Sequence, residues 1–175
     1  MELGGYVGYS TILFANAMRA RGGKQYYSLE NSPEFAAVIM ALVDLAGLRD
    51  MVRVVVGKAD ASIRRLAASG AIDHVDLLFL DHVKPLYVAD LKLCEQLGLI
   101  RPGSILAADN IIKPGNPLYL EYVHSTVAEK RARQKSQKDD ASRPDQGLDG
   151  NPNLVYESKM VKSFEPTGVP VRLST

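Results

Sequence analysis

Two acidic pairs stand where buried strands are expected to end, and their residue types suit metal chemistry. The pairs are Asp81-His82, which follows the apolar residues 75–80, and Asp109-Asn110, which follows residues 104–108. In an open α/β sheet, ligands bind outside the carboxyl ends of the strands, and neighbouring strands lie about 4.8 Å apart. If the two strands are neighbours, Asp81, Asp109 and Asn110 can share one Mg²⁺ ion, which prefers oxygen ligands. Lys84, three residues after Asp81, falls on the same side and is a candidate base.

Each of these residues also has an ordinary structural interpretation. Asp81 and Asp109 could cap the helices that follow their strands, because Asp is a preferred N-cap residue. Lys84 could be a solvated residue of a first helical turn, and His82 a hydrogen-bonded polar residue at the sheet edge. The joint occurrence of an Asn directly after Asp109 and a Lys three residues after Asp81 favours the metal site.

The elements that must position these residues follow from the hydrophobic pattern. Apolar runs alternate with segments of helical periodicity, which is typical of a parallel sheet. Strands are expected at residues 25–29, 51–56, 75–80 and 104–108, and helices at 11–19, 33–46, 59–68 and 87–97. The pattern predicts an α/β fold, a Rossmann-like sheet with helices on both faces. Pro33 and Gly47 mark the start and end of one expected helix.

Composition restricts the class of protein. The chain has 175 residues, 46% of them hydrophobic, which predicts one globular domain over residues 1–175. A formal net charge of +1 gives no field that would attract nucleic acid or an anionic membrane. The single cysteine, Cys94, lies in an apolar helical context and cannot form a disulfide framework, so we expect it to be buried. Without a signal sequence or membrane span, a cytoplasmic, monomeric protein with a small-molecule partner is expected.

The stretch from residue 128 to residue 153 differs from the rest of the chain. It is rich in Lys, Arg, Asp, Ser, Pro and Gly and has almost no apolar residues to offset the entropy of ordering. We interpret it as a mobile insertion, a solvated helix end followed by a loop, rather than as a nucleic-acid-binding arm. A final strand is expected at residues 154–161.

A glycine-rich loop opens the chain and leads into the first expected helix. Residues 2–10 read Glu-Leu-Gly-Gly-Tyr-Val-Gly-Tyr-Ser, and Glu30 ends the next strand, where a carboxylate can accept both hydroxyls of a ribose. Glu2, just before the glycines, would repel a pyrophosphate and suits a cationic ligand. This combination favours S-adenosylmethionine over a dinucleotide. The alternative is a structural turn with a solvated Glu30.

Three motifs together resemble catechol O-methyltransferases. They are Glu-Leu-Gly-x-Tyr-x-Gly-Tyr-Ser at residues 2–10, Phe-Leu-Asp-His-x-Lys at 79–84 and Ala-Asp-Asn-x-Ile-x-Pro-Gly at 108–115. The resemblance implies a class I methyltransferase fold, a magnesium ion, and methyl transfer from S-adenosylmethionine to one hydroxyl of a catechol. It covers residues 2–123, and more weakly 154–170.

The resemblance also implies roles for individual residues. The metal ligands would be Asp81, Asp109 and Asn110, with Lys84 as the general base and Glu165 as an acceptor for the second catechol hydroxyl. The donor would be bound by Glu2, Gly4, Tyr6, Ser10, Glu30, Asp81 and His82. Pro114 would either line the substrate wall or form a plain turn.

The chain departs from the family pattern at both ends. Family members carry helices before the glycine loop, which are missing here, and the last residues leave little room for the last antiparallel strand of the family. An alternative function is therefore a non-catalytic fragment that binds S-adenosylmethionine or a partner protein. A nicotinamide-dependent oxidoreductase would fit the glycine loop alone but leaves the metal-ligand residues unexplained.

Overall fold

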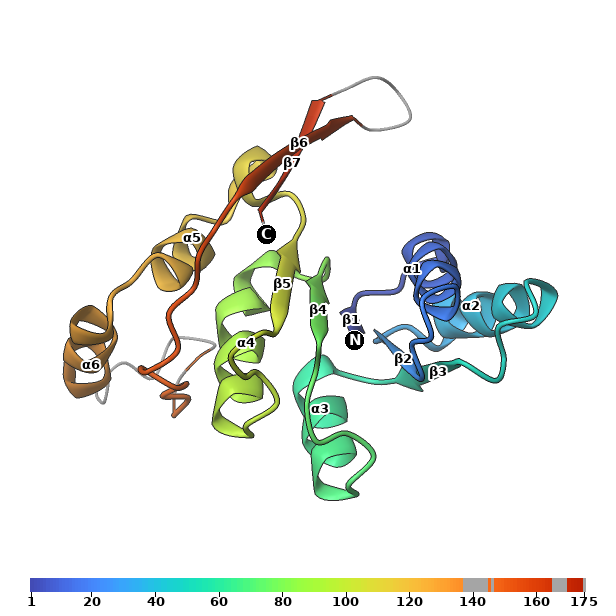
Figure 1. Ribbon diagram of the computed structural model, residues 1–175, viewed down its shortest axis with the longest axis horizontal. Helices are drawn as coiled ribbons and strands as arrows, with labels where there is room; N and C mark the ends of the chain where they lie inside the picture. Colours follow the sequence, from blue (N-terminus) through green and yellow to red (C-terminus); the bar gives the residue numbers. More distant parts are fainter. Residues whose placement is uncertain (137–144, 146, 165–169, 175) are drawn as a thin grey trace.

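A mostly parallel sheet organises the computed structural model, which describes residues 1–136, 145, 147–164 and 170–174. In this part of the chain the strand order is β3-β2-β1-β4-β5-β7-β6 (Figure 1). The strands are β1 Glu2–Leu3, β2 Tyr26–Glu30, β3 Val52–Val56, β4 Leu77–Leu80, β5 Ile105–Ala108, β6 Met160–Phe164 and β7 Pro170–Ser174. The pairs from β3 to β5 are parallel, so these strands end at one common edge.

Helices cover both faces of this sheet, as the hydrophobic pattern predicts. They are α1 Tyr9–Arg19, α2 Pro33–Leu45, α3 Ala59–Ala68, α4 Tyr87–Gln96, α5 Pro117–Val123 and α6 Val127–Ser136, with short turns η1 Lys84–Leu86 and η2 Ile111–Gly115. One core packs α1 and α2 against Tyr26 and Val52, and the other packs α3, α4 and α5 against Leu29 and Val55. Alternate residues of a strand point to opposite faces, so β2 and β3 contribute to both cores. None of the described helices is long and apolar enough to cross a membrane.

The elements expected in the parallel part of the sheet are confirmed, with shifts of one or two residues at their ends. Helix α2 begins where Pro33 predicts it, and the Ser32 hydroxyl caps it by accepting from the Phe35 N–H at 3.2 Å. The fold class is the predicted one. Pro33 and the Ser32 cap therefore set the start of α2.

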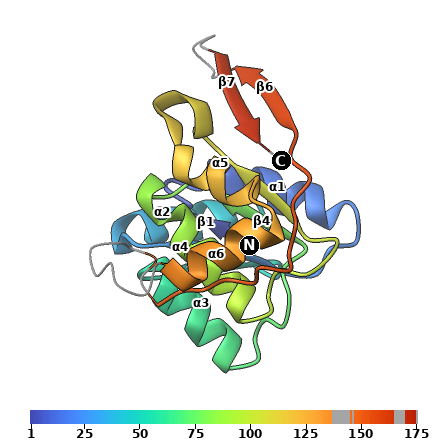
Figure 2. The ribbon, with the colours of Figure 1, turned by 90° about the vertical axis from the view of Figure 1, so that its left-hand side faces the viewer.

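The far edge of the sheet differs from the sequence analysis. A last antiparallel strand, for which the sequence left little room, is present: β7 pairs with β5 at Ala108 and with β6 along its length. The final strand expected at residues 154–161 instead begins at Met160, because the preceding residues pack against α4 and α6. The β6–β7 hairpin projects beyond the helices in both views (Figures 1 and 2).

The predicted insertion at residues 128–153 contains regular structure at its start. Helix α6 begins after Thr126, whose hydroxyl accepts from the Glu129 N–H at 3.3 Å while the Glu129 carboxylate accepts from the Thr126 N–H at 2.8 Å. This reciprocal arrangement is a capping box. Residues 137–144 and 146 lie outside the described part, and the mobility of the insertion stays a prediction.

Candidate functional site

A cavity of 780 Å³ lies at the carboxyl ends of the parallel strands. Its lining comes from the glycine loop, the ends of β2, β3 and β4, the first turns of α3 and α4, and residues 147 and 148. The lining residues are Gly4, Tyr6, Leu29, Glu30, Asn31, Phe35, Gly57, Lys58, Ala59, Asp60, Arg64, Asp81, His82, Val83, Leu86, Ala89, Asp90, Gly147 and Leu148. Its volume suits a ligand of nucleoside size or larger.

The glycine loop approaches the end of β4 closely. Gly4 has φ +92°, and a Cβ there would lie 2.6 Å from the Asp81 carbonyl oxygen, so this position needs glycine. Tyr6 also has a positive φ, 47°, and its N–H donates to Glu30 Oε2 at 2.8 Å. The ring of Tyr6 packs edge-on against Phe35 with a centroid separation of 4.7 Å. The loop thus places Gly4 and Tyr6 in the cavity wall.

Glu2 lies outside the lining of this cavity, and its predicted contact with the donor stays a prediction. Its side chain is fully buried, and its carboxylate accepts from the hydroxyls of Ser10, Thr11 and Ser28. Ser10 donates to Glu2 and is likewise outside the cavity lining. Because these hydroxyls belong to α1 and β2, Glu2 fixes the helix start against the sheet.

Glu30 lies where the sequence predicts a ribose acceptor. It ends β2, lines the cavity and is 8% exposed. Oε2 accepts from the Tyr6 N–H and Oε1 accepts from the Ser32 N–H, each at 2.8 Å. Two main-chain donors therefore hold the carboxylate in one orientation, and its remaining lone pairs are available to a ligand hydroxyl.

The four residues of the predicted metal and base set lie at neighbouring strand ends. Leu80 pairs with Ala108 in the parallel register, so Asp81 and Asp109 are the next residues on β4 and β5. Lys84 Nζ lies 3.1 Å from Asp81 Oδ1. Burial raises the pKa of Asp81, the Lys84 ammonium lowers it, and the Asp109 carboxylate raises it, with a net upward shift. The carboxylates of Asp81 and Asp109 and the ammonium of Lys84 thus lie together in a partly buried space.

Asn110 follows in the left-handed region, with φ 56°, and its N–H donates to Asp109 Oδ1 at 2.7 Å. This hydrogen bond ties the Asp109 side chain to its own turn. The turn continues into η2, which contains Pro114. Glu165, the predicted acceptor for a second hydroxyl, lies outside the described residues.

Tyr87 is a site residue that the sequence analysis missed. Lys84 Nζ donates to the Tyr87 hydroxyl at 2.8 Å, and that hydroxyl lies 3.4 Å from the Asp109 carbonyl oxygen. Burial, followed by the Asp81 and Asp109 carboxylates, raises the pKa of Tyr87, so the hydroxyl stays protonated. Its position three residues after Lys84, at helical spacing, was the available signal.

His82 is held by a second residue that was missed, Asp90 of α4. Its Nε2 lies 2.7 Å from Asp90 Oδ2, and the two side chains are 10% and 4% exposed. The imidazole stacks on Tyr87 with a centroid separation of 5.0 Å and an interplanar angle of 11°. Nδ1 is buried and has no hydrogen-bond partner among the described residues. His82 therefore presents a fixed ring at the cavity wall.

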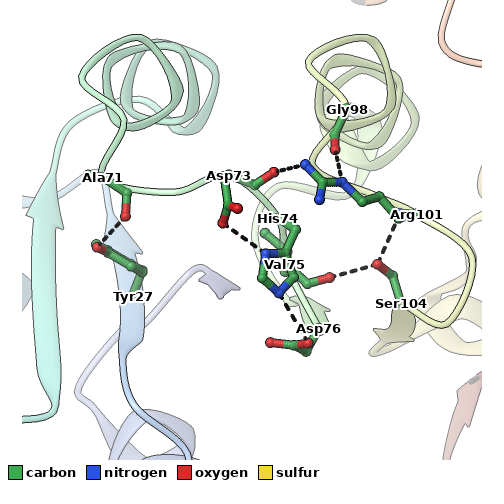
Figure 3. Close-up of polar contacts among 9 residues, drawn as sticks. All are labelled: Tyr27, Ala71, Asp73, His74, Val75, Asp76, Gly98, Arg101 and Ser104. Atoms are coloured by element: carbon green, nitrogen blue, oxygen red, sulfur yellow. Dashed lines mark hydrogen bonds and ion pairs between the residues drawn. The ribbon is translucent and has the colours of Figure 1, made fainter.

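The other histidines, His74 and His124, do not line the cavity. His74 Nδ1 contacts Asp73 Oδ1 at 2.8 Å, in the loop before β4 (Figure 3). Arg101 reaches the same loop by donating to the Asp73 carbonyl at 2.5 Å, and Ser104 donates to the Val75 carbonyl at 2.7 Å. These bonds join the entries of β4 and β5, so His74 is structural.

The comparisons with known proteins agree with this geometry. Residues 1–111 match a family model described as a methyltransferase domain. Catechol O-methyltransferase from Bos taurus is 42% identical over 123 residues, which cover 70% of this chain and 44% of that protein. The chain belongs to the methyltransferase domain family. Catechol O-methyltransferase B from Danio rerio is 40% identical over 136 residues, covering 78% of this chain and 51% of that protein.

Solved structures extend the agreement to the fold of this methyltransferase domain. The O-methyltransferase from Bacillus cereus in complex with SAH has a TM-score of 0.62 and 21% identity, over 99% of this chain and 70% of that one. At this identity the likeness concerns the fold alone. The chain spans about half the length of the curated relatives it matches.

The side chains of this methyltransferase domain fit the groups that the family implies. The described residues contain no cluster of three His, Cys, Asp or Glu side chains able to hold a metal ion. The predicted set has instead two carboxylates and the Asn110 amide, an all-oxygen donor set that suits a hard cation. The Lys84 ammonium beside Asp81 indicates that this space favours positive charge. For a nucleoside, the cavity offers the oriented Glu30 carboxylate and the fixed ring of His82.

Proposed function

We propose that this chain is an S-adenosylmethionine- and Mg²⁺-dependent O-methyltransferase that acts on one hydroxyl of a catechol. The observation that carries the proposal is the position of Asp81. Its side chain lines the nucleoside-sized cavity, and it also pairs with Lys84 beside the Asp109 turn. One residue therefore borders both the space for a donor and the space for an acceptor.

The donor would occupy the cavity, with its ribose on Glu30 and its adenine beside Ala59 and Asp60. Glu30 accepts two main-chain N–H groups, so a ribose hydroxyl would meet a carboxylate that is already oriented. Gly4 and Tyr6 provide a main-chain wall, and His82, locked by Asp90, provides a flat one. When bound, S-adenosylmethionine supplies an electrophilic methyl group on a positively charged sulfur.

The metal would be held by Asp81, Asp109 and Asn110. A bound Mg²⁺ ion lowers the pKa of a chelated hydroxyl, which makes a catechol a better nucleophile. Lys84 Nζ, in its neutral form, accepts the hydroxyl proton as general base. The Tyr87 hydroxyl, 2.8 Å from Nζ, keeps the amine in place.

The remaining contribution of the chain is positioning. Holding two reactants in line can contribute about 7–11 kcal/mol to rate acceleration at most. The sheet edge supports this role, because β4 and β5 fix Asp81 and Asp109 in adjacent register positions. No covalent intermediate on the enzyme is needed. The role of Glu165, the monomeric state, the cytoplasmic location and the lack of nucleic-acid or membrane partners stay predictions.

The test is methylation of a simple catechol by S-adenosylmethionine, with saturating Mg²⁺ and with a chelator. We expect Mg²⁺-dependent turnover that is lost in Asp109→Ala, while affinity for S-adenosylhomocysteine is kept. Asp76→Ala is a matched control, because its side chain is 93% exposed and lies in the loop before β4. Turnover that survives the chelator would exclude the metal mechanism.

Binding of the donor without any turnover would support a second function, the non-catalytic fragment. Isothermal titration calorimetry with S-adenosylmethionine and with catechol, each alone and then together with Mg²⁺, distinguishes the two. If the chain is an enzyme, a ternary complex and product must form. If it is a binding fragment, only the titration with S-adenosylmethionine needs to show binding.

A further inference from the structure

The last part of the polar insertion contributes to the cavity wall. We call residues 147–156 the return segment; in Figure 1 it passes between α6 and α4 on its way to β6. Gly147 and Leu148 line the cavity, although the family resemblance does not cover them. Leu148 also packs against the main hydrophobic core. This placement is unexpected for a stretch with so few apolar residues.

Buried polar contacts anchor the return segment on α4. Glu95, 3% exposed, accepts from the Asn151 N–H at 2.8 Å and from the hydroxyls of Tyr122 and Tyr156. Gly150 has φ +67°, and a Cβ there would lie 2.5 Å from Glu95 Oε2. The backbone at Gly150 therefore lies so close to Glu95 of α4 that a residue with a side chain would not fit there.

A second anchor lies on the other side of Leu148. Lys92 Nζ and Asp145 Oδ2 form an ion pair at 2.8 Å, and their side chains are 6% and 7% exposed. Further along, Lys130 of α6 donates to the Leu154 carbonyl at 2.8 Å. Leu148 is thus held between fixed points at Asp145 and Asn151.

From this geometry we infer that Leu148 sets donor affinity by forming part of the wall against the adenosine half of the donor. The turn η1 contributes Leu86 to the cavity, helix α4 contributes Ala89, and the return segment docked on that helix adds Leu148. An apolar side chain suits the face of an adenine ring better than the charged amino-acid end of the donor. The inference rests on the proposed function, since it assumes that the donor occupies this cavity.

The test compares Leu148→Ala with Leu154→Ala by titration calorimetry of the full chain. Leu154 belongs to the same segment and packs against the same core, but it does not line the cavity. The ligands are S-adenosylhomocysteine and 5′-methylthioadenosine, which shares only the adenosine half. Leu148→Ala should raise both dissociation constants about tenfold, and Leu154→Ala less than about twofold.

The possible outcomes separate this inference from the proposed function. If the wild-type chain binds neither ligand, the proposed function fails and the inference fails with it. If the wild type and Leu148→Ala bind the ligands equally well, the inference alone is overturned. The same holds if Leu154→Ala loses as much ligand affinity as Leu148→Ala. The inference is also overturned if Leu148→Ala binds S-adenosylhomocysteine more weakly than the wild type does but binds 5′-methylthioadenosine equally well.

Two further variants cover a failure of Leu148→Ala to fold. Leu148→Met keeps an apolar side chain of similar volume and should bind within about threefold of the wild type. Leu148→Ser tests the apolar requirement and should bind at least as poorly as the Ala variant is expected to. The fitted stoichiometry reports the folded fraction, so a purely structural defect would lower it without changing the dissociation constant.

Discussion

Replacing Glu95 by Gln tests whether the buried carboxylate on α4 stabilises the fold. Oε2 accepts from the Tyr122 hydroxyl at 2.5 Å and the Asn151 N–H at 2.8 Å, and Oε1 accepts from the Tyr156 hydroxyl. A hydrogen bond to a charged group contributes about 1.5–3 kcal/mol and a neutral one about 0.5–1.5 kcal/mol. The amide oxygen can keep two bonds at the neutral value, and the amide N–H₂ must donate to Tyr156 instead.

The neighbouring cation adds to this loss. Burial lowers the pKa of Lys130, the Glu95 carboxylate raises it, and Lys92 lowers it. Without the carboxylate, the partly buried Lys130 ammonium loses a favourable charge interaction, which destabilises the folded state. Removing the buried charge of Glu95 has the opposite effect, because that charge no longer has to be taken out of water. We expect a net loss of about 2–3 kcal/mol in the free energy of unfolding, or a fall of about 4–12 °C in the melting temperature.

The assay is urea unfolding followed by far-ultraviolet circular dichroism, with melting curves alongside. Glu121→Gln is the matched control, because Glu121 pairs with Arg133 at 2.6 Å but its side chain is 58% exposed. A surface pair contributes about 0–1 kcal/mol, so this variant should be close to the wild type. If Glu95→Gln were as stable as Glu121→Gln, the carboxylate would not anchor the return segment.

The remaining predictions concern the site and two buried groups. Lys84→Met should lower kcat by about 10²–10⁴, the usual contribution of a general base, with donor affinity unchanged; an unaltered kcat in a steady-state assay would rule out its role as the base. Asp109→Asn should raise the Mg²⁺ concentration needed for half-maximal turnover, measured by metal titration, and an identical titration curve would argue against ligation. Cys94 is fully buried and burial raises its pKa, so a thiol reagent should label it only in urea; rapid labelling of the native chain would contradict this. Burial and then Glu95 raise the pKa of Tyr156, so its contribution to stability is complete below pH 10 and falls as the pH rises further; Tyr156→Phe should flatten that loss in unfolding curves at pH 8–11.

The strand ends were predictable because their signals are local. An apolar run followed at once by Asp81 or Asp109 marks both the strand and the residue at its carboxyl end. The parallel α/β pattern then brings β4 and β5 together, and the register places the two carboxylates side by side. The spacing of three residues placed Lys84 on the side of Asp81, and the 3.1 Å contact agrees, although a turn and not a helix joins the two residues.

Contacts between distant parts of the chain were not predictable in this way. Asp90 reaches His82 across eight residues, and nothing in the local pattern indicates that this Asp turns inward. The return segment is harder still, since Asn151 contacts Glu95 from 56 residues away. The hydroxyl partners of Glu2 were not predictable for a related reason, because they come from α1 and from β2.

Helix α4 contacts two parts of the cavity wall that lie far apart in the sequence, the residues around Lys84 and the return segment. Its first residues position the site, since Tyr87 holds Lys84 and Asp90 holds His82. Its last turn, through Glu95, holds the segment that carries Leu148 to the cavity wall. Every residue from Tyr87 to Glu95 is buried, so the helix has little freedom to shift within a packed core. A displacement at Glu95 would therefore be transmitted along α4 to Asp90, the residue that holds His82 at the cavity wall.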